Sequence, residues 1–306
     1  MDYLIEKCDE GKCIRTFVKE KLKISAKLLT KLKKLEDGIM LSGKRVTVRA
    51  ILKDGDVLTL NIEHEQNIND KIVASDTSVD IIFEDEYYIA LNKPPFMPTH
   101  PSHNHYDDTL ANAVAGLYKR RNTPFVFRAI NRLDKNTSGV VIFAKSADSA
   151  NKLSKLHQNK LIDKEYLAIA EGICNESGII DGYIKRVDGS VMLREFSKDK
   201  TSESHQYCNT IYKKLANSDS ASLLSVKITT GRTHQIRVSF SYIGHHIIGD
   251  DLYSQDTYPN RHMLHCSCIS FIHPYTKKQI FLKSPIPDDF KNVMIMKGIE
   301  YDTKDI

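Results

Sequence analysis

The sequence has no run of about 18 apolar residues, the length that a transmembrane helix requires. Its first segment, residues 1–7, also lacks the basic and then apolar order of a secretory signal peptide. None of the six cysteines belongs to a C-x-x-C pair, which excludes the knuckles that build a structural zinc site. Internal repeats and low-complexity tracts are absent as well. We therefore expect a cytoplasmic protein with reduced thiols and no membrane partner.

Size and charge distribution point to a two-part chain. With 306 residues and 41% hydrophobic content, the chain can bury a sizeable core and is long enough for two domains. The net charge of +5 is modest, but residues 1–62 hold 14 Lys and Arg against 9 Asp and Glu, which leaves 30 of each sign elsewhere. A concentrated basic patch releases counterions from phosphates more effectively than a uniform one. This distribution indicates a nucleic-acid contact in the first fifth of the chain.

The N-terminal region predicts a helix followed by short strands. Ser25 can cap the helix, and leucines follow at the spacing of one helical face, with lysines mostly on the other. The leucines are Leu28, Leu29, Leu32 and Leu35, and the lysines include Lys27, Lys31 and Lys34. Glycine turns at 42–44 and 53–56 separate strands predicted at 39–41, 46–48 and 57–62.

The remainder of the chain predicts an α+β domain. Residues 63–79 are polar without a regular period, which is typical of a linker. Strands are predicted at 79–83, 87–91, 140–144, 166–170, 223–228 and 269–273, and helices at 109–118, 147–157 and 233–242. Because the strands do not alternate regularly with helices, the pattern favours a mixed or antiparallel sheet.

The most informative segment is Asn131-Arg132-Leu133-Asp134-Lys135-Asn136-Thr137-Ser138-Gly139, which an apolar stretch follows. A turn that places a carboxylate between two cations ahead of a strand can hold an anionic nucleophile, here Asp134, at the edge of a pocket. The same residue types also form ordinary solvated turns. A second informative segment, Thr230-Gly231-Arg232-Thr233-His234-Gln235-Ile236-Arg237-Val238, occurs later in the chain.

Both segments, in this order and spacing, resemble the RluA-type pseudouridine synthases, which isomerise uridine to pseudouridine in structured RNA. Matching segments elsewhere are Leu91-Asn92-Lys93-Pro94-Pro95, Lys164-Glu165-Tyr166-Leu167-Ala168, Gly249-Asp250-Asp251-Leu252-Tyr253, Arg261-His262-Met263-Leu264-His265-Cys266 and Phe271-Ile272-His273-Pro274. One short motif would be a weak indication, whereas a series across nearly the whole chain is specific.

The resemblance also implies a domain organisation. Leu41-Ser42-Gly43-Lys44 and Asp54-Gly55-Asp56 resemble an S4-like RNA-binding domain, which is often found ahead of this synthase family. We therefore expect a small α/β S4-like domain over residues 1–62 and a linker over 63–79. The α+β catalytic domain of pseudouridine synthase type, with its mixed or antiparallel sheet, would cover residues 80–306.

The resemblance implies three catalytic residues. Asp134 matches the catalytic aspartate and Arg237 its basic partner, a guanidinium that favours the ionised carboxylate. Tyr166 matches the active-site tyrosine, whose ring can stack on uracil; its hydroxyl is a poor base near neutral pH unless it is tuned. Two routes stay open, because the carboxylate can attack C1′ or remove a proton from C2′ to give a glycal.

RNA is the implied partner, with ribosomal RNA favoured and transfer RNA as the alternative. Arg132 resembles the arginine that some relatives insert in place of a flipped nucleotide, although it could instead bind phosphate. Further RNA contacts are expected from Arg232, Thr233, His234, Gln235, Lys27, Lys31, Lys34, Lys44 and Arg45. A monomer is the default expectation.

No cofactor or metal is expected. Isomerisation involves no redox change, and His100, His103 and His105 have no carboxylate or cysteine partner at ligand spacing. The sequence departs from the family pattern at Asn131 and Ser239, where histidines are usual, and at His246, where proline is common. Two other functions stay open: RNA binding without catalysis, and hydrolysis of a nucleoside glycosidic bond, which also uses a carboxylate at an anomeric carbon.

Overall fold

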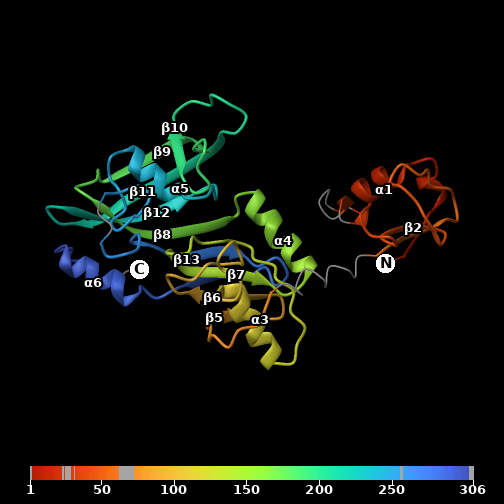
Figure 1. Cartoon of the computed structure of the whole chain (residues 1–306), viewed down its shortest axis with the longest axis horizontal. Helices are drawn as coiled ribbons and strands as arrows, with labels where there is room; N and C mark the ends of the chain where they lie inside the picture. The colour runs from red at the N-terminus through yellow and green to blue at the C-terminus, as the bar shows by residue number, and fades with distance from the viewer. Residues whose placement is uncertain are drawn as a thin grey trace. The chain divides into compact units, whose positions relative to one another are not determined.

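The computed structural model describes residues 2–22, 24, 29–30, 32–61, 72–255 and 258–302. It divides into two compact units, residues 1–71 and 72–306, and each has its own hydrophobic core (Figure 1). Part of what the sequence predicts lies outside the described residues: the Ser25 cap, Lys27, Lys31 and residues 63–71 of the expected linker.

Unit 1 is built on a small antiparallel sheet. Its strands are β1 (Asp2–Leu4), β2 (Ile39–Leu41), β3 (Lys44–Arg45) and β4 (Val57–Leu60), in the order β1-β4-β2-β3. A short 3-10 helix, η1 (Lys7–Asp9), precedes helix α1 (Ile14–Glu20). The apolar side of α1 and the buried residues of β4 share one core; Phe17 and Leu58 belong to it.

The strand predicted at 46–48 is wrong by two residues. Ser42 and Gly43 both have positive φ, at 48° and 77°, and form a tight two-residue turn. Lys44 therefore pairs directly with Leu41, and the strand ends at Arg45.

Unit 2 is organised around one large sheet. Its strands are β5 (Asp80–Glu84), β6 (Tyr88–Lys93), β7 (Ser138–Ala144), β8 (Ile162–Glu171), β9 (Ser177–Arg186), β10 (Arg194–Ser197), β11 (Gln206–Asn217), β12 (Ala221–Ile228), β13 (Leu264–Ile272) and β14 (Gln279–Lys283). Their order is β10-β9-β11-β12-β8-β13-β7-β6-β5, with β14 paired to β13. Among the described strands, only β13 and β7 run parallel; the other neighbours are antiparallel.

Four helices are described in unit 2: α3 (Leu110–Arg120), α4 (Ala147–Gln158), α5 (Gln235–Tyr242) and α6 (Asp288–Met296). Capping boxes begin two of them, from Thr109 to Asn112 in α3 and from Ser146 to Ser149 in α4. In Figure 1, α5 lies beside β11, whereas α4 lies at the other part of the sheet and packs against β7. No described helix has the length and apolar content needed to cross a bilayer.

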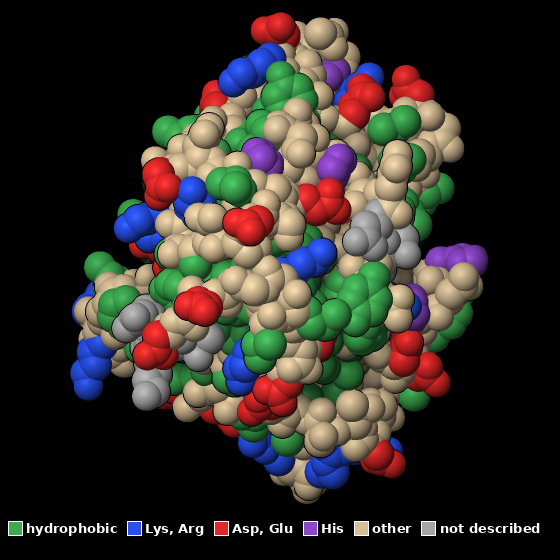
Figure 2. All heavy atoms as spheres, turned by 90° about the vertical axis from the view of Figure 1, so that its left-hand side faces the viewer, with side chains coloured by type: hydrophobic (Ala, Val, Ile, Leu, Met, Phe, Trp, Pro, Cys, Tyr) green, Lys and Arg blue, Asp and Glu red, His purple; other side chains and the backbone are tan. Residues whose placement is uncertain are grey.

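The predicted α+β class with a mixed sheet is confirmed, and all six strands predicted for this unit are present. The elements that were not predicted from the sequence are β1, η1, α1, β9, β10, β11, β14 and α6. Burial alternates over residues 207–213 of β11, but its buried side includes the polar Thr210 and its exposed side includes Ile211, so the hydrophobicity of the sequence does not show this alternation. The face drawn in Figure 2 shows acidic, basic and apolar side chains interspersed rather than gathered by type.

Candidate active site

Asp134 lies on a tight turn that leads directly into β7, whose seven residues are all buried. The backbone N–H of Thr137 donates to the carbonyl of Asp134 at 3.1 Å and closes the turn. The Asp134 side chain is 31% exposed, so its carboxylate is accessible without lying fully in solvent. The turn is thus fixed to the central sheet while its carboxylate can meet a substrate.

Buried side chains from other segments hold this turn in place. Lys93, which is 0% exposed, donates from Nζ to the carbonyl of Lys135 at 3.0 Å. The same Nζ donates to the carbonyls of Pro94 and Met97 at 2.8 and 2.7 Å. Burial lowers the pKa of Lys93 to about 7, and the charge of Asp134 acts in the opposite direction. Lys93 is therefore both a clamp on the turn and a buried charge near Asp134.

Asn131 attaches the start of the turn to β7. Its amide nitrogen donates to the carbonyl of Val140 at 2.9 Å, and its amide oxygen accepts from the backbone N–H of Ile142 at 2.9 Å. The side chain therefore satisfies backbone groups as a neighbouring strand would. Asn131 departs from the family pattern, yet it positions the turn.

Gly139 permits a close approach between β7 and β13. Its φ of +117° is rare for other residues, and a Cβ there would lie 2.2 Å from the carbonyl oxygen of Cys266. Only glycine fits where the nucleophile turn enters the sheet.

The segment before β13 supplies two further anchors for the turn. The Oγ1 of Thr137 lies 2.7 Å from Nε2 of His262, and Nη1 of Arg261 donates to the carbonyl of Asn136 at 3.1 Å. Burial, followed by the nearby cations, lowers the pKa of His262 well below its usual value. His262 is thus a neutral, buried partner of the turn.

Arg237, on α5, has Asp250 as its principal partner. Its Nε and Nη2 donate to the two carboxylate oxygens of Asp250 at 2.7 and 2.6 Å, and both side chains are buried. Its Nη1 lies 3.5 Å from Oδ2 of Asp134. Burial alone would lower the pKa of Arg237, but the bonds to Asp250 outweigh it and the pKa is raised. The expected pair of Asp134 and Arg237 is brought together, with Asp250 holding the guanidinium.

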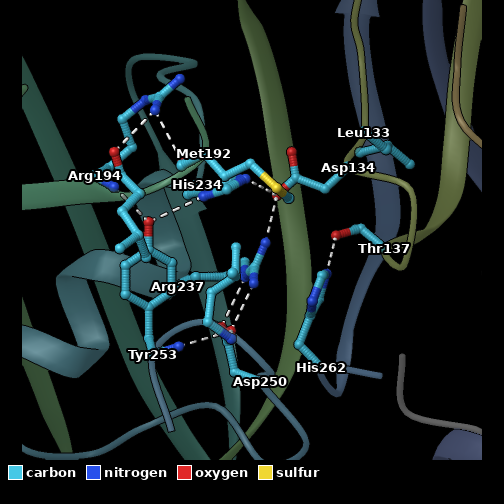
Figure 3. Close-up of polar contacts among 12 residues, drawn as sticks. Leu133, Asp134, Thr137, Met192, Arg194, His234, Arg237, Asp250, Tyr253 and His262 are labelled. Atoms are coloured by element: carbon cyan, nitrogen blue, oxygen red, sulfur yellow. Dashed lines mark hydrogen bonds and ion pairs between the residues drawn. The ribbon is translucent and has the colours of Figure 1, made fainter. Parts of the chain in front are cut away.

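His234 approaches Asp134 from the start of α5. Its Nε2 lies 3.9 Å from Oδ2 of Asp134, and its Nδ1 lies 3.0 Å from the hydroxyl of Tyr253 (Figure 3). His234 has a φ of 58°, an uncommon backbone conformation for a residue with a side chain. Burial lowers the pKa of His234, Asp134 opposes this change, and Arg237 adds to it.

Tyr166 is almost fully buried on β8, opposite Cys266 of β13. Burial raises the pKa of Tyr166 well above its usual value, and Cys266 and Asp134 act in the same direction. The hydroxyl is therefore protonated at neutral pH.

The other residues predicted to contact RNA divide by exposure. Arg132, Arg232 and Thr233 are exposed near the Asp134 turn and the start of α5, and Arg232 donates from Nε to the carbonyl of Tyr207 at 3.1 Å. Gln235 is buried, accepting from Thr230 and donating to the carbonyl of Asn209. Its amide is thus engaged inside the protein, where it fixes the loop ahead of α5.

In unit 1, the expected cationic residues Lys34, Lys44 and Arg45 are exposed. Other cations of this unit are engaged internally, because Lys12 and Lys21 form ion pairs with the buried Asp9 at 2.8 and 2.5 Å. Part of the basic excess of residues 1–62 is therefore neutralised by ion pairs inside unit 1.

Two groups of acidic, histidine or cysteine side chains converge in the described part of the chain: Glu6, Cys8 and Asp9, and Asp250, Asp251 and His262. The three histidines weighed as metal ligands in the sequence are not among them; Nδ1 of His105 lies 2.6 Å from Asp108. In the second group, Arg237 already binds both carboxylates. A cation there would compete with the guanidinium.

Sequence reasoning assigned no role to Asp250, Lys93 or His262, although each lies in a segment that matched the family. The available signal was their position inside those segments. Their partners lie in other parts of the chain, so spacing alone could not identify them.

The arrangement offers one accessible carboxylate surrounded by buried groups that fix it. Asp134 can act as a nucleophile or as a base, because its Oδ2 faces two nitrogen-bearing side chains that stabilise negative charge.

Comparisons with known proteins show which family this chain resembles. The family model for RNA pseudouridylate synthase matches residues 87–242. An RNA pseudouridine synthase of Bacillus subtilis, YjbO, itself described as uncharacterised, is 32% identical over 89% of this chain and 95% of its own length. The ribosomal large subunit pseudouridine synthase D of Pseudomonas aeruginosa is 31% identical over 83% of each chain. The structure of human RNA pseudouridylate synthase domain containing 4 has the same fold, with a TM-score of 0.59, 23% identity and coverage of 73% of this chain and 95% of its own.

Proposed function

The chain belongs to the RNA pseudouridylate synthase family and isomerises uridine in RNA, and from this premise we propose that Asp134 carries the reaction. The observation that supports the assignment is its geometry. The carboxylate is partly exposed, yet it lies 3.5 Å from the Arg237 guanidinium and 3.9 Å from His234. A solvated surface turn would not place a carboxylate against a buried, fully paired arginine.

The reaction breaks the bond from C1′ to N1, and uracil leaves with the electron pair. The base then turns, C5 forms a new bond to C1′, and the proton lost from C5 is balanced by one gained at N1. Asp134 can attack C1′ and later be displaced by C5, or it can take the C2′ proton and return it. Both routes require an ionised carboxylate, and neither requires a cofactor.

Arg237 contributes by position and charge. Asp250 accepts hydrogen bonds from Nε and Nη2 of Arg237 and thereby fixes the guanidinium. Its third nitrogen, Nη1, is therefore already oriented toward Asp134. The arginine stabilises the carboxylate before attack and again when it is released. Tyr166 supplies the ring on which uracil stacks, a role that fits its protonated hydroxyl better than proton removal does.

We further propose that ribosomal RNA is the substrate, since several relatives are named as ribosomal large subunit enzymes. Arg132, Arg232 and Thr233 would contact RNA near Asp134, and His234 and Gln235 would position the loop. Lys34, Lys44 and Arg45 would contribute from an S4-like domain over residues 1–62, which a linker over 63–79 joins to the catalytic domain over 80–306. We expect the protein to act as a cytoplasmic monomer.

The test is Asp134→Asn, with Asp163→Asn as the matched control because Asp163 is an exposed carboxylate on β8. Release of tritium from C5-labelled uridine in RNA measures turnover, and filter binding measures RNA affinity. We expect Asp134→Asn to lose turnover while binding persists, and Asp163→Asn to behave as the unaltered protein. Turnover retained in Asp134→Asn contradicts the assignment, and free uracil as the product would indicate a hydrolase. Mapping pseudouridines in RNA from cells with and without the gene identifies the substrate.

A further inference from the structure

The hairpin between β9 and β10 displays two neighbouring apolar side chains at its tip. Val191 and Met192 are 79% and 58% exposed, directly after the polar turn Asp188-Gly189-Ser190. Single exposed apolar residues are common on protein surfaces and need no explanation. This pair differs from them because its backbone is held rigidly and is connected to the candidate active site.

Polar groups of the tip are hydrogen-bonded to one another. Nη1 of Arg194 lies 3.4, 2.9 and 2.9 Å from the carbonyl oxygens of Val191, Met192 and Leu193. The Oγ of Ser190 accepts from the backbone N–H groups of Met192 and Leu193 at 3.3 and 2.9 Å. A loop whose backbone is fixed in this way has little backbone conformational entropy left to lose on binding.

Two side chains connect the tip to Asp134. The backbone N–H of Arg194 donates to the Tyr253 hydroxyl at 2.9 Å, and that hydroxyl lies 3.0 Å from Nδ1 of His234. Nε2 of His234 in turn lies 3.9 Å from Asp134. Figure 3 shows this series from Arg194 through Tyr253 and His234 to Asp134, and in this view the Met192 side chain extends across to Asp134. The tip is therefore part of the rim of the site.

We propose that Val191 and Met192 form an apolar wedge that enters the RNA base stack when the target uridine turns out toward Asp134. The inference rests on the proposed role of Asp134. Turning a base out of a stack loses stacking energy, and an apolar side chain between the neighbouring bases recovers part of it. The flexible, polarisable methionine can adapt to the faces of different bases. Because neither Val191 nor Met192 is charged, the wedge would act through apolar contact, whereas Arg132 would act through its charge.

The test replaces both residues, Val191→Ser with Met192→Ser. The matched control is Ile295→Ser with Met296→Ser, an adjacent pair on α6 that is 75% and 62% exposed. The substrate is C5-tritiated total RNA from cells that lack the gene, either folded with magnesium or heat-denatured with EDTA. We expect tritium release from folded RNA to fall about tenfold in the wedge variant, with a much smaller change on denatured RNA. The control variant should match the unaltered protein on both.

A second measurement reports base extrusion itself. An oligonucleotide that spans the mapped uridine, with 2-aminopurine beside it, should brighten on binding to Asp134→Asn protein. The increase should be lost when the wedge substitutions are added. Unchanged turnover on folded RNA, an equal loss on both RNAs, or a retained fluorescence increase each overturns the wedge. Turnover in Asp134→Asn would instead overturn the proposed catalytic residue, so the two failures are distinguishable.

Discussion

Asp250 binds Arg237 through two hydrogen bonds, 2.7 Å from Nε and 2.6 Å from Nη2, and thereby leaves Nη1 facing Asp134. The guanidinium is thus shared between a buried carboxylate, that of Asp250, and a partly exposed one, that of Asp134. The position of the Arg237 guanidinium beside Asp134 therefore depends on the fully buried Asp250.

Replacing Asp250 tests that dependence. Asp250→Asn removes the charge that compensates a buried arginine, and breaking a buried ion pair typically costs about 3–5 kcal/mol. We expect a lower free energy of unfolding in urea and a loss of turnover, because the guanidinium would move toward Asp134 or lose its orientation. Asp251→Asn is the control, since Asp251 is more than half exposed and lies 3.4 Å from Arg237. Equal, small effects of both substitutions would contradict the positioning role.

Lys93 provides a second test of how the turn is held. Lys93→Met keeps the length of the side chain but leaves the carbonyls of Pro94, Met97 and Lys135 without its Nζ. An unsatisfied buried polar group costs about 1–3 kcal/mol, so stability should fall. The loosened turn should lower kcat more than KM, because substrate binding does not depend on Lys93. Single-turnover and steady-state kinetics separate the two, and a change in KM alone would exclude the clamp.

Gly139 and Gly244 form a matched pair for a backbone test. Both have positive φ, but a Cβ at Gly139 would lie 2.2 Å from the Cys266 carbonyl oxygen, whereas nothing lies within 4 Å at Gly244. Gly244→Ala should therefore cost only backbone strain, about 1 kcal/mol. Gly139→Ala should lower the melting temperature much further, since β7 and β13 must separate. Similar melting temperatures for the two variants would contradict this close approach.

Acid should destabilise the protein through buried histidines. Burial lowers the pKa of His265 from its ordinary value of 6.5 to about 4. Between these values the unfolded chain binds a proton that the folded protein does not, so stability is present above pH 6.5 and is lost as the pH falls toward 4.

This shift in the pKa of His265 corresponds to about 3 kcal/mol of folding free energy. Urea unfolding measured at pH 7 and pH 4.5 should show the loss, and His265→Asn should reduce it. His103→Asn is the control, because His103 is exposed. An identical pH dependence in the His265 variant would show that other groups cause the loss.

Elements that are marked by a local sequence pattern, such as an apolar run or a helix cap, could be predicted from the sequence. The apolar run over 140–144 identified β7, because a strand buried on both faces reads as continuous hydrophobic sequence. The Thr109 and Ser146 caps agree with helices that begin where they were predicted. In contrast, β11 was not predicted, because the polar Thr210 faces inward and the apolar Ile211 faces outward, so only its pairing with β9 and β12 reveals the strand.

By itself, the sequence determined which residue types occur in series along the chain, and so the family, the reaction and the candidate nucleophile Asp134. Only the tertiary structure decided which hydrogen-bond and ion-pair partners these residues have. It assigned Arg237 chiefly to Asp250, turned Gln235 inward, and joined Thr137 to His262 across 125 positions. The physical reason is that a motif records local chemistry, whereas hydrogen bonds and ion pairs between distant segments exist only once the sheet has brought those segments together.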